Sequence, residues 1–281
     1  MRVAATLTMT EAERLKISTF IEAEFGIKMP AIKKSLLEGR LAKRVHQCGL
    51  RSYGDYFDFV LRDPRGRDEF LVFEDLVSTH ETSFFREVSH FHYLEQTVLP
   101  ELLAETERTS VAVLSAASST GEEAYTLAMV LDRAVGALRN RSFDFSVEGV
   151  DLSSHAVSVA ERGIYLADRV KSIPTDWKQQ YLMASKDRRK DLCRFVPELR
   201  ARTAFHTGNL LGSMNLSRAS YDVVFCRNVL IYFDKDNQQR ALSLLVSHLK
   251  PKGYLFLGHS ESMLGLHLPV KSVAQAVFQK L

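Results

Sequence analysis

Residues 114–131 read LSAASSTGEEAYTLAMVL and join two different sequence patterns. The apolar run VAVL that leads into them, at 111–114, is typical of a buried strand, and the residues that follow Gly121 have the period of an amphipathic helix. Small and hydroxylated residues fill the junction. They allow a ligand to approach the backbone, and the helix N-terminus offers unpaired N–H groups. The stretch predicts an open α/β sheet with a ligand site where its first strand ends.

The rest of the chain divides into two textures. Residues 10–77 read as successive helices without a convincing strand. After residue 80, short strand-like runs such as FDFSVEGVD, YDVVFC and GYLFLGH alternate with helical stretches, which predicts a parallel sheet with right-handed crossovers. We therefore expect an all-α domain at 1–78 and a Rossmann-like α/β domain at 79–281. The charged segment 186–207 is interpreted as a small antiparallel β insertion.

Composition limits the class of protein. The 281 residues are 46% hydrophobic and 25% charged, as in ordinary globular proteins, and no apolar run approaches the roughly 20 residues needed to cross a bilayer. No signal peptide is recognised at the N-terminus. Cys48, Cys193 and Cys226 show neither disulfide nor metal spacing, and His90 and His92 diverge on a helix. A cytoplasmic protein with reduced thiols and no metal site is expected.

Two adjacent carboxylates, Glu122 and Glu123, stand where the first helix begins. They would repel a pyrophosphate, and the stretch lacks both GxGxxG and a phosphate-loop lysine. A nucleoside ligand that carries positive charge and no phosphate fits better, and S-adenosylmethionine is such a ligand. The pairs Ser119–Glu122 and Thr120–Glu123 also match capping boxes, so a purely structural role at the helix end is equally consistent with the pattern.

Three later features favour the ligand interpretation. Asp151 ends the second strand, where an acidic side chain accepts hydrogen bonds from both hydroxyls of a ribose, although it could instead cap a helix near Ser153. Asn209, in TGNLLG, is placed to contact an adenine edge. The run FCRNVLIYF, at 225–233, sets Arg, Asn and Tyr in an otherwise apolar strand end, and such polar groups need partners that a ligand can supply.

These residues together resemble the CheR-type methyltransferases, which methylate glutamates of chemotaxis receptors. The similarity covers nearly the whole chain in six ordered motifs: HETSFFRE (80–87), AASSTGEEAY (116–125), DLSSHAVSVAERGIY (151–165), GNLL (208–211), FCRNVLIYFD (225–234) and GYLFLGHSES (253–262). The resemblance implies transfer of a methyl group from S-adenosylmethionine to a receptor glutamate, with S-adenosylhomocysteine as product. Because a glutamate is ionised at pH 7, this reaction needs no general base.

The resemblance also implies residue roles. Arg86 and Tyr232 would flank the transferred methyl group as catalytic residues. At His80 this sequence departs from the asparagine usual in the family, which puts that contact in doubt. The insertion resembles a subdomain that binds a receptor tail in some members, but its loop ASKDRRKD lacks the associated glycines, so a tethered and an untethered enzyme both fit. The implied cofactor contacts are His80, Thr82, Arg86, Glu123, Asp151, Asn209, Leu210, Arg227 and Asn228.

A basic helix is predicted at about 30–48. Residues 28–51 contain seven Lys or Arg against Glu38 alone, or +6 within a chain whose net charge is +3. An apolar stripe of Ile32, Leu36, Leu37, Leu41 and Val45 is expected to pack this helix down. Under the resemblance its basic face meets the acidic methylation helices of receptors, while a solvated face or a nucleic-acid partner are the alternatives. The expected partner-binding residues are Lys33, Lys34, Arg40, Lys43 and Arg44.

Other functions are consistent with parts of the pattern. A different S-adenosylmethionine enzyme could act on RNA through the basic helix, and a non-catalytic module could sense the cofactor. A nicotinamide dehydrogenase is disfavoured because the phosphate-binding glycines are missing. We expect a monomeric methyltransferase without a nucleic-acid partner and without direct membrane insertion, recruited from the cytoplasm to membrane receptors.

Overall fold

The computed structural model describes residues 7–104, 108–137, 143–187, 189–212, 214, 216 and 220–281. The chain forms two compact units, which are treated separately below. The helical unit comprises Met1–Thr79 with Tyr232–Asp234, and the α/β unit comprises His80–Ile231 with Lys235–Leu281. Among the described residues, no helix combines the length and the apolar character needed to cross a membrane.

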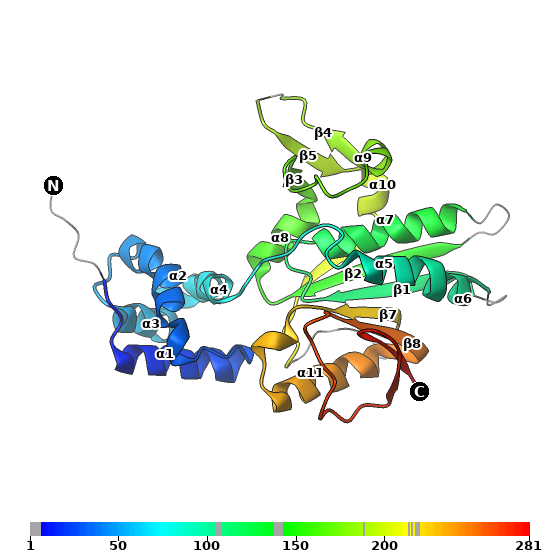
Figure 1. Ribbon diagram of the computed structural model, residues 1–281. Coiled ribbons are helices and arrows are strands. Elements are labelled where there is room, and N and C mark those ends of the chain that lie inside the picture. The colour runs from blue at the N-terminus through cyan, green and yellow to red at the C-terminus, as the bar shows by residue number, and fades with distance from the viewer. Residues whose placement is uncertain are drawn as a thin grey trace. The chain divides into compact units, whose positions relative to one another are not determined.

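Local sequence signals set the bounds of the helices in the helical unit (Figure 1). A capping box between Thr10 and Glu13 starts α1, and Gly26 ends it in a left-handed conformation. Ser52 caps α3 by accepting from the Asp55 N–H. The elements are α1 (Glu11–Phe25), the 3-10 turn η1 (Ala31–Lys33), α2 (Lys34–Gln47), α3 (Tyr53–Arg62), the 3-10 turn η2 (Pro64–Gly66) and α4 (Arg67–Val77).

The apolar stripe of α2 is narrower than its sequence predicts. Leu37, Leu41 and Val45, one turn apart, are each at most 1% exposed and pack into the core of the unit. Ile32 is 91% exposed and Leu36 is 46% exposed, so the predicted five-residue stripe is wrong at these two positions. The reason is angular: Leu36 lies about 100° around the helix from Leu37 and faces outward, while Ile32 precedes the helix in η1.

The α/β unit is built on a seven-stranded sheet with the order β6-β2-β1-β7-β8-β10-β9. The first five strands of that order are parallel, and β10 pairs antiparallel with β8 and β9. Ala116 pairs with both Val150 and Cys226, so β1, β2 and β7 end at the same edge. The strands are β1 (Ser110–Ala116), β2 (Asp144–Asp151), β6 (Thr203–Thr207), β7 (Tyr221–Cys226), β8 (Leu249–Leu257), β9 (Val270–Ala274) and β10 (Val277–Lys280).

Helices cover the sheet, with α7 and α11 on opposite sides (Figure 1). Residues of α7 such as Leu127 and Leu131 are fully buried. Helices on both faces bury the apolar side chains of a largely parallel sheet. The helices are α5 (Val88–Tyr93), a π-helical turn η3 (Leu94–Val98), α6 (Leu99–Ala104), α7 (Glu122–Gly136), α8 (Ser154–Arg162), α9 (Thr175–Tyr181), α10 (Pro197–Arg200), the 3-10 turn η4 (Leu230–Tyr232) and α11 (Lys235–His248).

A three-stranded antiparallel sheet forms the small subdomain, in the order β3-β5-β4. Its strands are β3 (Ile164–Leu166), β4 (Leu182–Ala184) and β5 (Leu192–Phe195), so it begins well before residue 186. The expectation that 186–207 as a whole is antiparallel was wrong, because β6 at its end pairs parallel with β2 in the main sheet. The charged sequence is tolerated there because β6 is an edge strand that buries only Phe205.

One ion pair should stabilise the helical unit measurably. Glu69 is 6% exposed and accepts from Arg44 Nε at 2.6 Å, Arg44 Nη2 at 2.5 Å and Tyr56 Oη at 2.8 Å. Glu69→Ala leaves three donor groups of two side chains without their acceptor, so we expect a loss of about 2–4 kcal/mol in the free energy of unfolding. Urea denaturation of the full chain, followed by far-UV circular dichroism, measures this loss of stability.

Asp58→Ala is the matched control, because Asp58 pairs with Lys16 at 2.7 Å in a solvent-exposed bridge. Such a bridge contributes at most about 1 kcal/mol. Equal, small effects of both substitutions would contradict the role assigned to Glu69.

Candidate cofactor and methyl-transfer site

The loop between β1 and α7 has an unusual backbone. Ala117, Ser119 and Gly121 all have positive φ, at 60°, 49° and 94°. Gly121 is required there, because a Cβ would lie 2.8 Å from the Ala160 Cβ. The Oγ atoms of Ser118 and Ser119 are buried and have no hydrogen-bond partner among the described residues. A tight turn of small residues that contains two such hydroxyls is suited to a polar ligand.

Asp151 links that loop to the end of β2. Its Oδ2 accepts from the Ser119 N–H at 2.7 Å and its Oδ1 from the Ser153 N–H at 3.0 Å. The helix cap of α8 is Ser153, whose hydroxyl accepts from the Ala156 N–H, so the alternative that Asp151 caps this helix is wrong. Asp151 therefore ties the β1 loop to the end of β2 through both of its carboxylate oxygens.

The two glutamates of α7 do not form the capping boxes. The N-cap is Gly121, without a side-chain cap. Glu122 is 1% exposed and pairs with Arg169, which also donates to the Thr82 carbonyl at 2.9 Å. Glu123 Oε1 accepts from Ser115 Oγ at 2.7 Å. The alternative of a purely capping role is therefore excluded for both glutamates.

Arg227 is the positive charge of the site. Its side chain is 2% exposed, and its Nε lies 2.9 Å from Glu123 Oε2, an ionic contact rather than a linear hydrogen bond. Its Nη2 donates to the Arg86 carbonyl at 2.6 Å, and its Nη1 lies 3.2 Å from His90 Nδ1. Burial raises the pKa of Glu123, and the Arg227 charge offsets part of that shift.

The other predicted contacts surround the same edge. Asn209, half-buried after β6, accepts from the Leu211 N–H, and Leu210 is 6% exposed. Asn228 has φ of 59° and donates from Nδ2 to Glu87 Oε1 at 3.2 Å. Arg86 Nη1 donates to the Glu81 carbonyl at 2.8 Å. The predicted residues His80, Thr82 and Arg86 are half-buried in the segment before α5.

Tyr232 is the exception among the predicted residues. It belongs to the helical unit, where the Lys28 N–H donates to its carbonyl at 2.9 Å and the Lys33 ammonium lies 5.5 Å from its ring centroid. Within the α/β unit, contacts link Arg86, Arg227 and Glu123 and join Asp151 to the β1 loop, and Tyr232 takes no part in them. Its pairing with Arg86 stays a prediction.

Sequence reasoning gave no role to two carboxylates at this edge, Glu87 and Glu261. Glu261 Oε1 accepts from the N–H groups of Val229 at 2.9 Å and Leu230 at 2.7 Å, and its Oε2 accepts from the Gly258 N–H at 2.6 Å. Glu87 and Glu261 lie in the motifs FFRE and GHSES. Apart from that position, no feature of the sequence indicated that these two carboxylates hold the site loops.

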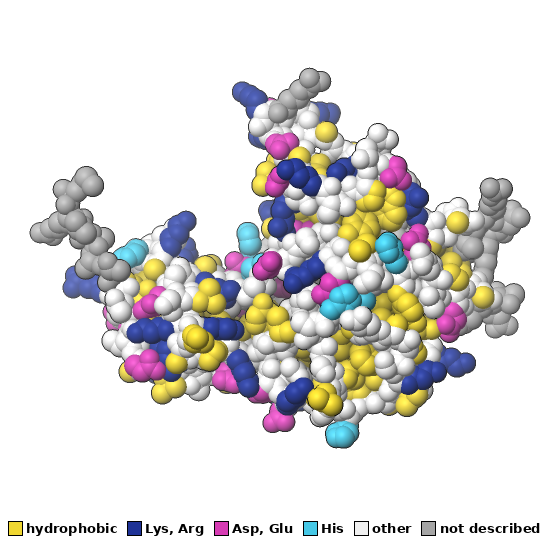
Figure 2. Space-filling view, in the orientation of Figure 1, with side chains coloured by type: hydrophobic (Ala, Val, Ile, Leu, Met, Phe, Trp, Pro, Cys, Tyr) yellow, Lys and Arg dark blue, Asp and Glu magenta, His cyan; other side chains and the backbone are white. Residues whose placement is uncertain are grey.

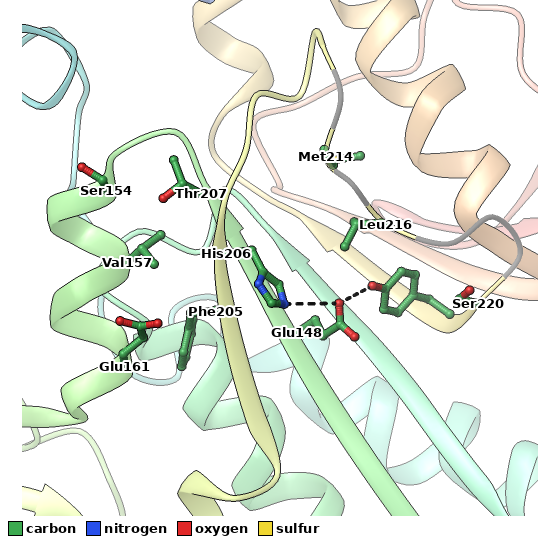
Figure 3. Close-up of a pocket in the computed structure, with 11 residues that line it drawn as sticks. Glu148, Ser154, Val157, Glu161, Phe205, His206, Thr207, Met214, Leu216 and Ser220 are labelled. Atoms are coloured by element: carbon green, nitrogen blue, oxygen red, sulfur yellow. Dashed lines mark hydrogen bonds and ion pairs between the residues drawn. The ribbon is translucent and has the colours of Figure 1, made fainter. Parts of the chain in front are cut away.

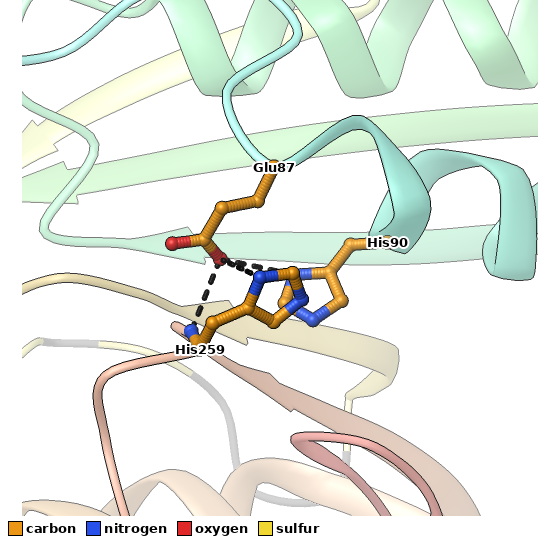
Figure 4. Close-up of side chains that lie close together, drawn as sticks. All are labelled: Glu87, His90 and His259. Atoms are coloured by element: carbon orange, nitrogen blue, oxygen red, sulfur yellow. Dashed lines mark hydrogen bonds and ion pairs between the residues drawn. The ribbon is translucent and has the colours of Figure 1, made fainter.

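Glu87, His90 and His259 form a cluster with the ligand types of a metal site (Figure 4). Their ligand atoms lie within 4.8 Å of one another. The Arg227 guanidinium, however, already contacts His90 Nδ1 and would repel a cation there. Burial and that charge lower the pKa of His90 to about 4. A neutral His90 beside Arg227 and an ionised Glu87 explain the cluster better than a metal site does.

A separate cavity of about 760 Å³ lies beside β2 and β6 (Figure 3). Its wall includes Glu148, which accepts from Tyr221 Oη at 2.6 Å and lies 3.9 Å from His206. None of the predicted cofactor residues is among its lining residues. The cavity is therefore distinct from the edge described above.

Comparisons with known proteins agree on one family. Residues 12–75 match the family described as CheR methyltransferase, all-alpha domain, and residues 80–278 match CheR methyltransferase, SAM binding domain. A chemotaxis protein methyltransferase of Klebsiella aerogenes is 34% identical over 93% of this chain and 87% of its own length. That of Escherichia coli is 33% identical over 93% and 88%.

Chemotaxis protein methyltransferase 2 of Pseudomonas aeruginosa is 34% identical over 90% of this chain and 87% of its own. A solved S-adenosylmethionine-dependent methyltransferase of Methanosarcina mazei aligns at 18% identity and a TM-score of 0.34 over 57% of this chain and 56% of that chain, a likeness too distant to carry weight. The two family matches together cover both the helical unit and the α/β unit of the chain. The chain belongs to the CheR methyltransferase family and is an S-adenosylmethionine-dependent methyltransferase of the chemotaxis type.

Proposed function

We propose that this chain methylates glutamate side chains of chemotaxis receptors, giving glutamate methyl esters and S-adenosylhomocysteine. The observation that carries the proposal is Asp151, whose carboxylate joins the β1 loop to the end of β2 at the edge where parallel strands bind nucleosides. The acidic character of this edge favours a cationic cofactor over a phosphorylated one. The curated relatives named above support the chemotactic setting.

The residues at the edge fit S-adenosylmethionine. Asp151 is proposed to accept from the ribose hydroxyls, and Asn209 and Leu210 to contact the adenine. The buried hydroxyls of Ser118 and Ser119 offer further hydrogen bonds. When bound, the cofactor supplies a methyl group activated by a sulfonium. The remaining proposed contacts are His80, Thr82, Arg86, Glu123, Arg227 and Asn228.

The charges of Glu123 and Arg227 neutralise each other, which the sequence does not reveal. Since Arg227 offsets Glu123, the pair contributes little net charge, and Asp151 is the stronger attraction for a cation. Arg86 and Tyr232 are proposed to orient the acceptor carboxylate. Alignment and exclusion of water then provide the rate, because the acceptor is already ionised at neutral pH.

The helical unit is proposed to contact the receptor through one face of α2. Leu36, Arg40 and Lys43 follow one another in α2 at spacings of four and three residues and therefore share a side of the helix, and Lys33 lies immediately before α2 in η1. Arg44 is committed to Glu69, and Arg40 donates to the Val77 carbonyl at 2.6 Å and to Thr79 Oγ1 at 2.8 Å. Basic and apolar side chains both reach the visible surface of this unit (Figure 2).

This surface is proposed to bind the acidic methylation helices of the receptor. The exposed apolar side chains of Ile32 and Leu36 favour a partner helix that carries apolar as well as acidic residues. We place the enzyme in the cytoplasm as a monomer recruited to membrane receptors, with residues 1–78 as the receptor-facing domain and 79–281 as the methyltransferase domain.

The role of Asp151 can be measured directly. Asp151→Asn keeps an acceptor oxygen for the loop but removes the charge, and losing a charged hydrogen bond costs about 1.5–3 kcal/mol. We expect the affinity for S-adenosylhomocysteine to fall at least about tenfold in calorimetry. Asp144→Asn, at the opposite end of β2, is the control and should bind normally. A folded Asp151→Asn protein with unchanged affinity would remove this residue from the site.

The absence of a required base predicts a flat pH profile. The acceptor glutamate, of pKa about 4.3, is ionised throughout the range from about pH 6.5 to 8.5. His90, whose burial lowers its pKa to about 4, is neutral across the same range and cannot change the rate there. Rapid-quench measurement of the chemical step with saturating cofactor tests this. A single-proton rise near neutrality would reveal a working base, and His80 would be examined first.

The receptor surface can be tested without disturbing the fold. Lys33→Glu with Lys43→Glu spares Arg44, whose reversal would set two carboxylates against each other at Glu69. We expect receptor methylation to fall at least about tenfold, with greater salt sensitivity in the wild type, because charge pairs steer association. S-adenosylhomocysteine affinity should be unchanged.

Lys252→Glu with Lys271→Glu provides a control of equal charge change on exposed residues of the α/β unit. The surface assignment fails if this control loses as much methylation as the α2 variant, or if neither loses any.

A further inference from the structure

The loop after β7 is held by two carboxylates at once. Glu261 binds the backbone, accepting from the N–H groups of Val229, Leu230 and Gly258. Glu87 binds the side chain of Asn228, accepting from Nδ2 at 3.2 Å with Oε1 and from the His259 N–H at 3.2 Å with Oε2. Asn228 is thus fixed both through its own side chain and through the backbone that follows it.

The conformation of Asn228 requires such support. Its φ of 59° is left-handed, a region that L-residues adopt rarely. The neighbouring loop approaches so closely that a Cβ at Gly258 would lie 2.9 Å from Asn228 Nδ2 and 3.0 Å from its backbone nitrogen. A residue held in this way is placed by its surroundings rather than by its own preference.

Glu87 also decides which end of the Asn228 amide faces which way. An ionised carboxylate accepts hydrogen bonds and cannot donate them, so it selects the orientation with Nδ2 toward Glu87. Burial pushes the pKa of Glu87 upward, but the bond from Asn228 and the Arg227 charge outweigh it and leave that pKa below its ordinary value. Glu87 is therefore ionised at neutral pH, and the amide oxygen of Asn228 is directed away from it.

We propose that Glu87 is a positioning residue for methyl transfer, which acts through Asn228 by presenting its amide oxygen to the cationic cofactor. The proposal rests on the proposed function, in which Asn228 contacts S-adenosylmethionine. An oxygen acceptor suits the ammonium and the electron-poor methylsulfonium, whereas an amide N–H would oppose them. Glu261 supports the arrangement by fixing the backbone of the same loop.

A double-mutant cycle separates positioning from general structural support. The variants are Glu87→Ala, Asn228→Ala and the double variant, measured for S-adenosylhomocysteine affinity by calorimetry and for turnover with receptor-containing membranes. Each single variant should lose about tenfold or more in turnover. If Glu87 acts through Asn228, the double variant should be within about twofold of Asn228→Ala. Multiplied losses, or an Asn228→Ala protein with wild-type affinity and turnover, would overturn the proposal.

Two further variants of this chain keep the test decisive if Glu87→Ala folds poorly. Glu87→Gln retains an oxygen for Asn228 Nδ2 and should recover part of the turnover that Glu87→Ala loses, and a Gln variant no better than Ala contradicts the proposal. Glu148→Gln, which removes a charge that contacts Tyr221 and His206 rather than the Asn228 loop, should behave as wild type. A wild-type chain that binds S-adenosylhomocysteine but methylates no receptor refutes the proposed function. The double-mutant cycle measured by S-adenosylhomocysteine affinity then still tests whether Glu87 acts through Asn228.

Discussion

The buried guanidinium of Arg227 is the constraint around which this site is arranged. A charge whose side chain is 2% exposed must be paired, because its desolvation would otherwise cost several kcal/mol. Glu123 of α7 supplies the opposite charge, and the Arg86 carbonyl and the His90 ring receive the remaining donors. The side chain consequently ties the end of β7 to the start of α7 and to the segment before α5. These are the segments that the proposed function assigns to cofactor binding.

Carboxylates, rather than the backbone N–H groups and lysines of phosphate-binding sites, determine the charge of this edge. Asp151 joins two loops, Glu261 joins two others and Glu87 orients an amide. Each carboxylate accepts hydrogen bonds from donors on separate segments. Each therefore contributes negative charge and also holds those segments together. The resulting edge disfavours anions, and this is the physical basis for a cofactor that is cationic and lacks phosphate.

The helical unit shows why charge counting by itself is a limited guide. The +6 segment suggests one continuous basic surface. Arg44 instead binds Glu69, and Arg40 binds the end of α4, while Lys43 shares a side of α2 with Leu36. Some basic residues of this stretch therefore stabilise the helical unit from within. Others form a mixed apolar and basic face, which is the face proposed to bind a partner helix.

The sequence determined the fold class and the family, because the alternation of strands and helices and six ordered motifs are local properties of the chain. It also proposed Asp151, Asn209, Arg227 and Asn228 as candidate contacts, since polar residues at strand ends are visible beside apolar runs. Only the tertiary structure decided that Arg227 neutralises Glu123, that β6 joins the main sheet, and that Glu87 and Glu261 hold the Asn228 loop. These facts depend on contacts across 30 to 140 positions of the chain, and no local pattern encodes which distant donor a carboxylate will meet.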